Sequence, residues 1–293
     1  MHKLYKNLDF IFTNFLRVMS FLTFILLVLI IFLISKESLS FFKEYSFWEF
    51  ISTTKWSPLS QNPSFGILPM ILSTLYTSLI ALTIALPIGV GTALFTSCIL
   101  KEKYHKYILP ILNLLAGIPS VVYGFFGLLV FVKFFETNFN FATGECILIG
   151  GIILAIMILP YIVANCHESM LKIKNSFNSV SSSLGVSRFY MIKALILPSS
   201  KLAIFTAATL GLSRGIGETM AVMMVIGNSP IIPALLSRGE TLSGLIALEM
   251  GAAEIGSTHY HALYGAGFTL ILMLIIINLI FVIIKNILEK KYL

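Results

Sequence analysis

The segment Phe205–Asn228 reads FTAATLGLSRGIGETMAVMMVIGN. It is long and apolar enough to cross a bilayer, because about 20 predominantly apolar residues span the hydrocarbon core. It nevertheless carries Arg214 and Glu218 near its middle. A charged side chain at that depth costs at least about 2.5 kcal/mol on insertion scales, so such residues are rare and face a bundle interior or a wet cavity. The segment therefore predicts a membrane helix with one polar face.

The spacing of the two charges is i, i+4, which places both on one face of a continuous helix where they can pair. No other expected span holds an acidic or basic residue near its centre. Two interpretations follow from the pair. It lines a substrate path, or it is a structural ion pair that locks two helices.

The composition indicates an all-α integral membrane protein. The chain is 57% hydrophobic and 11% charged, whereas soluble domains are about 25% charged. No long polar segment remains for a soluble catalytic domain. The net charge of +7 comes from basic residues in short loops at span ends, so we expect lipid and not nucleic acid beside them. The three cysteines are isolated, and His259 with His261 supplies only two ligands, so no metal or cofactor is expected.

We predict six spans, with residues 1–65 forming an N-terminal span and an outer amphipathic segment and residues 66–293 forming the core. The aromatic stretch Ser35–Pro63 is expected at the outer surface, and Leu242–Ala253 is apolar enough to dip into the membrane. Short loops are expected at Lys101–Lys106 and Lys133–Glu145. The predicted spans are Phe15–Ile34, Gly66–Leu100, Tyr107–Val132, Cys146–Ala164, Phe205–Asn228 and Ala262–Ile284.

Helix-breaking residues interrupt the third expected span. It contains the run from Gly117 through Pro119 and Ser120 to Gly124. Small residues allow close helix approach, and proline removes a backbone hydrogen bond. Irregular backbone at membrane depth is tolerated where protein packs on it or where it lines a cavity. The run predicts a helix break that either lines a pore or serves packing.

The distribution of basic residues predicts that both termini are cytoplasmic, since Lys and Arg are enriched in cytoplasmic loops. With the N-terminus inside, fourteen lie in inner segments and five in outer ones. The inner set is Lys3, Lys6, Arg17, Lys101, Lys103, Lys106, Lys172, Lys174, Arg188, Lys193, Lys201, Lys285, Lys290 and Lys291; the outer set is Lys36, Lys43, Lys55, Lys133 and Arg238.

The polar stretch 165–201 then faces the cytoplasm. It reads as two short helices joined around Gly185, a candidate C-cap glycine, with Pro198 ending the second. Apolar residues alternate there with basic ones. Such a helix suits a docking surface for another protein, or it lies on lipid as an interfacial helix.

This stretch resembles the coupling loop of ABC importer permeases, in which a short helix fits a groove on a separate ATPase. The resemblance rests on Gly185-Val186-Ser187-Arg188 and on Leu197-Pro198, thirteen residues after the glycine. The family pattern begins with Glu-Ala-Ala, where this chain has Ser179-Val180-Ser181. Since no Walker A sequence is present, ATP hydrolysis is expected in a partner and the chain is not expected to be an enzyme.

Further strings are similar to the C-type permease subunits of phosphate-specific ABC importers, the PstC family. They are Arg214-Gly-Ile-Gly-Glu218-Thr219-Met-Ala-Val, Val225-Ile-Gly-Asn228, Gly117-Ile-Pro119-Ser120-Val-Val-Tyr-Gly124-Phe-Phe-Gly127, and the Trp48–Trp56 region with Gly66-Ile-Leu-Pro69. The likeness covers the chain from about Trp48 to the end.

The resemblance implies a type I ABC importer permease in the bacterial inner membrane, with Arg214, Glu218 and Thr219 on the phosphate path. It also implies partners: a sister permease in a heterodimer, two ATPase subunits and an extracytoplasmic phosphate-binding protein. Three alternatives stay open at this stage: a permease for another oxyanion such as sulfate or molybdate, an ATP-independent secondary transporter or channel, and a scaffold in a membrane complex.

Overall fold

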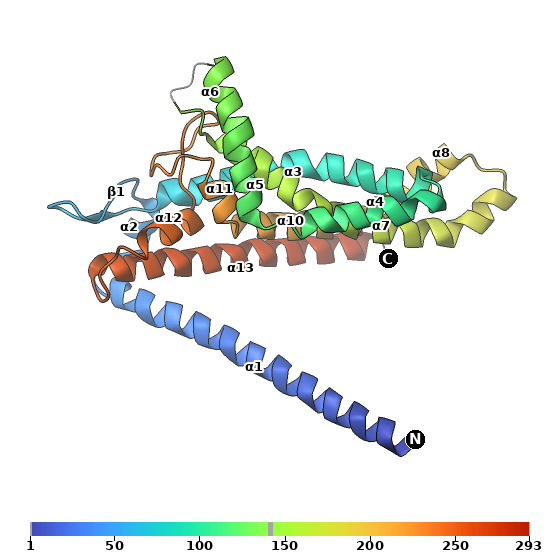
Figure 1. The fold of residues 1–293 in the computed structure, drawn as a ribbon, viewed down its shortest axis with the longest axis horizontal. Helices are drawn as coiled ribbons and strands as arrows, with labels where there is room; N and C mark the ends of the chain where they lie inside the picture. Colours follow the sequence, from blue (N-terminus) through green and yellow to red (C-terminus); the bar gives the residue numbers. More distant parts are fainter. Residues whose placement is uncertain (1, 140–142, 293) are drawn as a thin grey trace.

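Four long helices form the body of the molecule in the computed structural model, which describes residues 2–139 and 143–292. They are α3 (Leu68–Leu94), α7 (Ile147–Ser183), α10 (Lys201–Ile216) and α13 (Thr258–Tyr292). Figure 1 shows them running lengthwise in one bundle. The main core cluster is centred on fully buried apolar residues of α7, against which α3 and α10 pack. α7 is therefore the central helix of the fold.

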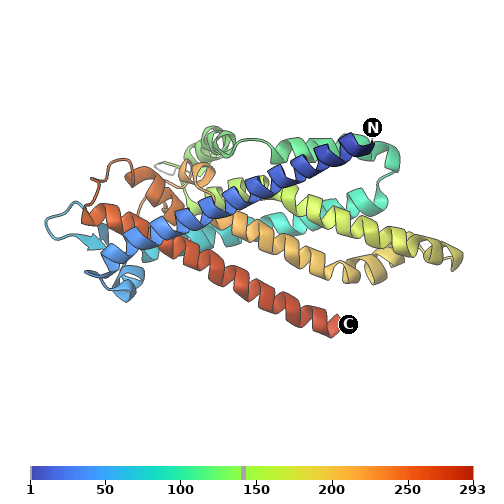
Figure 2. The same cartoon turned by 90° about the horizontal axis from the view of Figure 1, so that it is seen from below.

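The first helix, α1 (His2–Phe42), packs against α13 near its own C-terminal end. From there it diverges from the bundle toward the N-terminus (Figures 1 and 2). Its apolar part, Phe12–Phe42, is long enough to span a bilayer. The expected first span, Phe15–Ile34, lies within it and is confirmed.

Among the described residues, five helices are long and apolar enough to cross a membrane. The number rises to six if the bent pair Arg188–Ser199 and Lys201–Ile216, whose two halves meet at 58°, is counted as one span. The predicted α-helical membrane architecture is thus confirmed, with helices making up most of the fold. The five single helices are Phe12–Phe42, Leu68–Ile99, Ser120–Phe139, Ile147–Asn178 and Thr258–Lys290.

The third expected span, Tyr107–Val132, is wrong as a single helix. The chain forms α4 (Glu102–Ala116), breaks, and resumes as α5 (Ser120–Phe126), which a π-helical turn joins to α6 (Lys133–Phe139). α5 and α6 lie across the long axis of the bundle (Figures 1 and 2). Pro119 supplies no N–H at the break, and the residue before a proline is disfavoured in the helical region.

The two short loops predicted beside this span are also helical where the structure describes them. Lys101–Lys106 contains the start of α4, and α6 occupies the start of Lys133–Glu145, of which residues 140–142 lie outside the described part.

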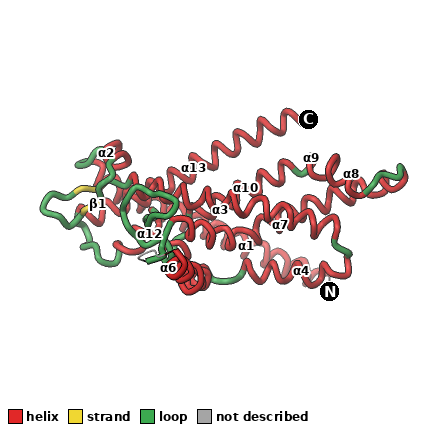
Figure 3. Tube along the Cα trace, turned by 90° about the horizontal axis from the view of Figure 1, so that it is seen from above, coloured by secondary structure: helices red, strands yellow, loops and turns green. Residues whose placement is uncertain are grey.

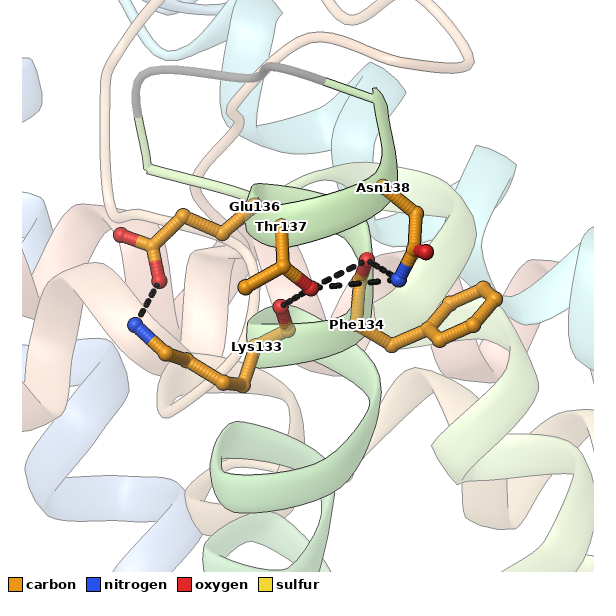
Figure 4. A network of polar contacts seen from close by, with 5 residues as sticks. All are labelled: Lys133, Phe134, Glu136, Thr137 and Asn138. Carbon is orange, nitrogen blue, oxygen red and sulfur yellow. Dashed lines mark hydrogen bonds and ion pairs between the residues drawn. The ribbon is translucent and has the colours of Figure 1, made fainter.

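Local contacts stabilise α6 (Figure 4). Lys133 Nζ lies 2.8 Å from Glu136 Oε2, and Thr137 donates to the Lys133 carbonyl at 2.9 Å. Asn138 Nδ2 donates to the Phe134 carbonyl, also at 2.9 Å. Contacts between residues three or four positions apart stabilise a helix even where its residues are polar. The polar composition of this segment therefore led to the wrong prediction of a loop.

α7 continues 19 residues beyond the expected end of the fourth span at Ala164. The prediction of a separate first short helix in 165–201 is therefore wrong, because these residues form the end of α7. The second exists as α8 (Arg188–Met191), a π-helical turn and α9 (Leu197–Ser199), ending one residue after Pro198 as predicted.

The opposite end of the molecule holds most of the loops (Figure 3). There β1 (Trp56–Ser57) pairs antiparallel with β2 (Ser64–Phe65), beside the short helices α2 (Phe47–Ser52) and α12 (Leu242–Glu249). A second core cluster joins them to α1, α3 and α13; its aromatic members are Phe41, Phe50, Trp56 and Phe65.

The aromatic side chains of this segment pack against the protein on one side of α2, and the expected position of the segment at the outer membrane surface stays a prediction. Phe50 is fully buried, whereas Trp48 of the same six-residue helix is exposed. The aromatic residues form a packed cluster, with Phe41 and Phe50 ring centroids 5.0 Å apart. Burial of this kind is what aromatic residues contribute to a core.

Candidate functional site

The segment expected to form the fifth span as one helix is broken in the middle. α10 ends at Ile216, Gly217–Thr219 are not helical, and α11 covers only Met220–Met223. Because the helix ends between them, the i, i+4 spacing does not place Arg214 and Glu218 on a common face. Within residues 2–139 and 143–292 no ion pair joins the two side chains. The predicted Arg214–Glu218 pair is therefore wrong.

Arg214 lies in the last turn of α10 and is exposed on the surface of the chain. Its Cζ lies 4.1 Å from the centroid of the Tyr161 ring, which comes from α7. A guanidinium over an aromatic face at this distance makes a cation–π contact. One face of the guanidinium is thereby fixed on the protein, and its edge remains available to a ligand.

Two tyrosines tie this arginine to the helix break after α4. The Tyr161 hydroxyl donates to the Ala116 carbonyl at 2.9 Å, and the Tyr123 hydroxyl donates to the Leu115 carbonyl at 2.7 Å. Both carbonyls belong to the end of α4, where the last backbone acceptors lack i+4 partners; the Leu115 carbonyl also accepts the Ile118 N–H at 3.3 Å. The break and the arginine thus form one site, although about 100 residues separate them in sequence.

The position of Arg214 places a cation near the C-terminal end of its own helix, where the helix dipole favours positive charge. It lies 13 residues after Lys201, which is about 20 Å along the helix at 1.5 Å per residue. Arg214 therefore lies near the opposite end of α10 from the basic Lys201.

Glu218 has a different environment from the one expected. Its Oε1 accepts a hydrogen bond from the Ala221 N–H at 3.1 Å, at the start of α11. Its backbone carbonyl accepts from Ser243 Oγ at 2.8 Å. The next residue, Thr219, is the N-cap residue of α11 and is half-buried. The carboxylate therefore holds the backbone after the break, and among the residues that the structure describes no acidic side chain pairs with Arg214.

The four residues predicted as helix breaks divide into two groups. Gly117 and Pro119 lie in the break, and Ser120 is the first residue of α5. Gly124 lies inside α5, so its prediction as a helix break is wrong. A Cβ at Gly124 would meet the Ala221 Cα at 3.0 Å, so this glycine allows α5 to approach α11.

The structure brings together Arg214, the α4–α5 break and α11, and it adds Tyr123 and Tyr161, which sequence analysis did not identify. A hydroxyl-bearing aromatic residue next to Pro160 in an apolar span was the available indication. An arginine held in this way presents a permanent charge and planar donors, which suit the oxygens of an oxyanion. Among the described residues, no group of three or more His, Cys, Asp or Glu side chains is arranged to hold a metal ion.

The segment predicted to contact an ATPase lies at the end of the bundle that also holds both termini (Figure 1). Gly185 has φ +66°, its N–H donates to the Ser182 carbonyl, and the Val186 N–H donates to the Ser181 carbonyl at 3.0 Å. This pair of hydrogen bonds is a Schellman motif with glycine at the left-handed position, so the predicted C-cap glycine is confirmed. Ser187 Oγ then accepts the Tyr190 N–H at the start of α8.

Large apolar side chains are exposed around this turn. Leu184, Phe189 and Tyr190 are 73%, 75% and 61% exposed. Arg188 is also exposed, and Pro198 is exposed before the bend into α10. Exposed apolar groups gathered in one place mark an interaction site.

A polar cluster at the loop-rich end was not predicted either. Trp56 Nε1 donates to both Glu249 oxygens at 3.0 and 3.1 Å, and His259 Nε2 lies 2.7 Å from Glu249 Oε2. Glu240 is nearby and only 4% exposed. Burial, together with the charge of Glu249, raises the pKa of Glu240 to about 7.

Comparison with known proteins gives the following matches. The family described as "Binding-protein-dependent transport system inner membrane component" matches residues 85–293. The "Probable ABC transporter permease protein YqgH" of Bacillus subtilis is 35% identical over 226 residues, covering 77% of this chain and 73% of that protein.

Two further relatives carry phosphate in their names. The "Phosphate transport system permease protein PstC" of Xylella fastidiosa is 34% identical, covering 76% of this chain and 74% of the relative. The "Probable phosphate transport system permease protein PstC" of Methanocaldococcus jannaschii is 30% identical, covering 89% and 88%. Among solved structures, an inward-facing MetNI methionine ABC transporter chain matches with a TM-score of 0.58 at 15% identity, covering 75% of this chain and 94% of that one, which concerns the fold alone.

Proposed function

Because this chain belongs to the family of inner membrane components of binding-protein-dependent transport systems, we propose that it is the membrane-spanning permease subunit of an ATP-driven phosphate importer. It forms half of the translocation path and couples to a separate ATPase. Phosphate, as opposed to sulfate or molybdate, is supported by relatives named for phosphate transport at 30–34% identity over most of the chain.

The observation that carries this function is the exposed Arg214 guanidinium, which lies near the end of the apolar helix α10 and over the Tyr161 ring. An arginine that lacks an acidic partner and faces outward from one subunit is suited to bind an anion between two subunits. We expect phosphate oxygens to contact the edge of the guanidinium while Tyr161 keeps its plane in position. Hydrogen bonds to charged groups are worth about 1.5–3 kcal/mol each, so one arginine provides substantial selectivity for an anion.

In this proposal Glu218 shapes the backbone of the path and does not neutralise the charge of Arg214. Its bond to the Ala221 N–H supports the chain reversal after α10. A carboxylate that paired with Arg214 would compete with phosphate for the guanidinium. A carboxylate that accepts a backbone N–H weakens phosphate binding less. Thr219 stays a candidate path residue beside it.

Coupling to ATP uses the turn around Gly185 and the short helix that begins at Arg188. The exposed Leu184, Phe189 and Tyr190 supply an apolar surface of the kind that a groove on a partner protein covers. We infer two ATPase subunits there, a sister permease beside the Arg214 face and an extracytoplasmic phosphate-binding protein at the loop-rich end. The basic-residue distribution supports an inner-membrane orientation with cytoplasmic termini.

The test is phosphate uptake by the assembled complex in liposomes, normalised to incorporated protein. Arg214→Gln should reduce uptake at least about 10-fold, because a charged hydrogen bond of about 1.5–3 kcal/mol is lost. Arg17→Gln, an exposed arginine of α1, is the matched control and should transport normally.

Wild-type uptake by an assembled Arg214→Gln complex would contradict the role of this arginine. A complex that transports sulfate or molybdate in preference to phosphate would contradict the substrate.

A further inference from the structure

Two apolar grooves lie between α10 and α13 near the end of the molecule that holds the C-terminus. The first has a volume of 260 Å³ and is lined by Leu86 of α3, Phe205 and Ala208 of α10, and Leu288 of α13. The second has a volume of 170 Å³ and lies on the other side of Phe205, against Phe281 and Val282. In Figure 3 the C-terminal part of α13 diverges from α10.

Aromatic packing separates the two grooves. The Phe205 and Phe281 ring centroids are 5.2 Å apart, and both rings line the second groove. The hydroxyls of Thr206 and Thr209, which also line it, donate to carbonyls of their own helix at 2.9 Å. These threonines therefore present their methyl groups, and the grooves take hydrocarbon and not polar groups.

Each groove has one lysine on its wall. Lys201 lines the first groove and Lys285 lines the second. Lys201 also lines a third pocket of 340 Å³ at the bend before α10, together with Pro198 and Ser199. Lys285 Nζ lies 3.6 Å from Glu289 Oε1, and both side chains are more than 40% exposed, so this pair is weak. Each of the two apolar grooves therefore has a cationic side chain on its wall.

We propose that these grooves bind the acyl chains of an anionic phospholipid, whose headgroup is held by Lys201 and Lys285. Basic residues between membrane helices on the cytoplasmic side are a recognised basis for anionic lipid binding, at about 1 kcal/mol per residue. This inference depends on the membrane location of the chain and not on the transported substrate.

The lining of the grooves favours a lipid over a protein partner. Apart from one lysine each, the walls consist of hydrocarbon and threonine side chains. Two neighbouring grooves of this kind suit the methylene groups of two acyl chains. A zwitterionic lipid would fill the same grooves but would gain less from the two lysines.

The test is native mass spectrometry of the full chain assembled with its ATPase and sister permease. Phosphatidylglycerol is titrated against phosphatidylcholine with the same acyl chains, for wild type and for Lys201→Gln, Lys285→Gln and the double variant. Each single substitution should weaken phosphatidylglycerol binding about 5-fold, which corresponds to about 1 kcal/mol, and should leave phosphatidylcholine binding unchanged. Dihexanoyl phosphatidylglycerol, which has the same headgroup on short chains, should compete poorly.

The matched control is Lys172→Gln. Lys172 also pairs at i, i+4 spacing with a glutamate, Glu168 at 2.7 Å, but it lines neither groove. This variant should bind phosphatidylglycerol like wild type. Equal binding of the two headgroups, equal loss in Lys172→Gln, or effective competition by the short-chain lipid would overturn the proposal. So would binding to the isolated chain that disappears on assembly, because a protein partner would then cover the grooves.

Discussion

Tyr161 connects the chemistry of Arg214 to the backbone of a distant helix. Its ring supports the guanidinium at 4.1 Å, and its hydroxyl occupies the Ala116 carbonyl. The residue therefore has two separable functions, one in its ring and one in its oxygen. Substitutions that remove them one at a time distinguish a positioning role from a purely structural one.

We expect Tyr161→Phe to retain most phosphate uptake and Tyr161→Leu to lose it. The phenylalanine keeps the aromatic face, whereas the leucine removes a cation–π contact worth about 0.5–2 kcal/mol. Uptake by equal amounts of assembled complex measures the difference. Tyr76→Leu, on the half-buried Tyr76 of α3, controls for the general loss of a tyrosine. Equal uptake by Tyr161→Phe and Tyr161→Leu would argue against a role for the ring.

Glu240 gives the loop-rich end a pH dependence. Its folded pKa of about 7 lies above its ordinary value of 4.5. Between these values the folded state keeps the proton and the unfolded state releases it, so stability falls as pH rises from about 4.5 to about 7. The full effect is at most about 3 kcal/mol at 1.36 kcal/mol per pH unit.

Glu240→Gln should therefore raise the midpoint of thermal unfolding at pH 8 and change it little at pH 5. The fluorescence of Trp56, which contacts Glu249 in the same cluster, reports the transition. A variant with the same difference in midpoint between pH 5 and pH 8 as wild type would show that Glu240 does not cause the dependence.

At the scale of single elements, the end of α7 determines how the following short helix is presented. The Gly185 backbone is in the left-handed region, and a Cβ there would meet nothing within 4 Å. The constraint is therefore one of conformation and not of space. A left-handed residue with a Cβ costs about 1–2 kcal/mol.

We expect Gly185→Ala to weaken ATPase binding, because relief of the strain shifts the start of α8 and with it Phe189 and Tyr190. Gly185→Asn should bind better than the alanine variant, since asparagine tolerates the left-handed conformation. Dissociation constants for the purified ATPase and the permease pair in detergent would measure this. Unchanged affinity in Gly185→Ala would indicate that the turn is not part of the docking surface.

The same scale explains why α4, α5 and α6 replace one expected span. A proline breaks the helix after Ala116, and the carbonyls that it exposes are taken up by Tyr123 and Tyr161. The Leu115 carbonyl also accepts the Ile118 N–H at 3.3 Å, so the Tyr161 hydroxyl matters most, as the partner of the Ala116 carbonyl. Residues on α5 and α7 thus support the helix break, at about 0.5–1.5 kcal/mol for each hydrogen bond.

At the scale of the whole molecule, both termini and the turn around Gly185 lie at one end, and the β-hairpin, α2 and α12 lie at the other (Figure 1). This arrangement agrees with an even number of membrane crossings. It also separates the proposed ATPase-binding end from the proposed end for the binding protein.

The orientation can be tested with single cysteines, since Cys98, Cys146 and Cys166 are buried in the structure. Gln61→Cys, exposed in the β-hairpin, should react with a membrane-impermeant maleimide from outside, and Ser176→Cys, exposed on α7, only from the cytoplasm. Labelling of intact cells and of inverted vesicles gives the two sides. Reaction of the Gln61 cysteine only in inverted vesicles would reverse the proposed orientation.

The sequence by itself determined the class of this protein. Apolar runs near 20 residues long have few alternatives to membrane helices, and Gly185 and Pro198 mark turns through local backbone chemistry that needs no tertiary contact. For the same reason the break at Gly117–Pro119 was predictable. The prominence of Arg214 was predictable as well, because a charge is rare in an apolar span.

Only the tertiary structure decided what these residues do to one another. The i, i+4 spacing places Arg214 and Glu218 side by side only if one continuous helix contains both residues. The glycines between them do not reveal from sequence whether the helix ends there. The contacts of Arg214 with Tyr161, and of Tyr161 with Ala116, join segments 45 or more residues apart. Such contacts depend on how helices pack, and the pattern along a single helix carries no information about which partner its polar face will meet.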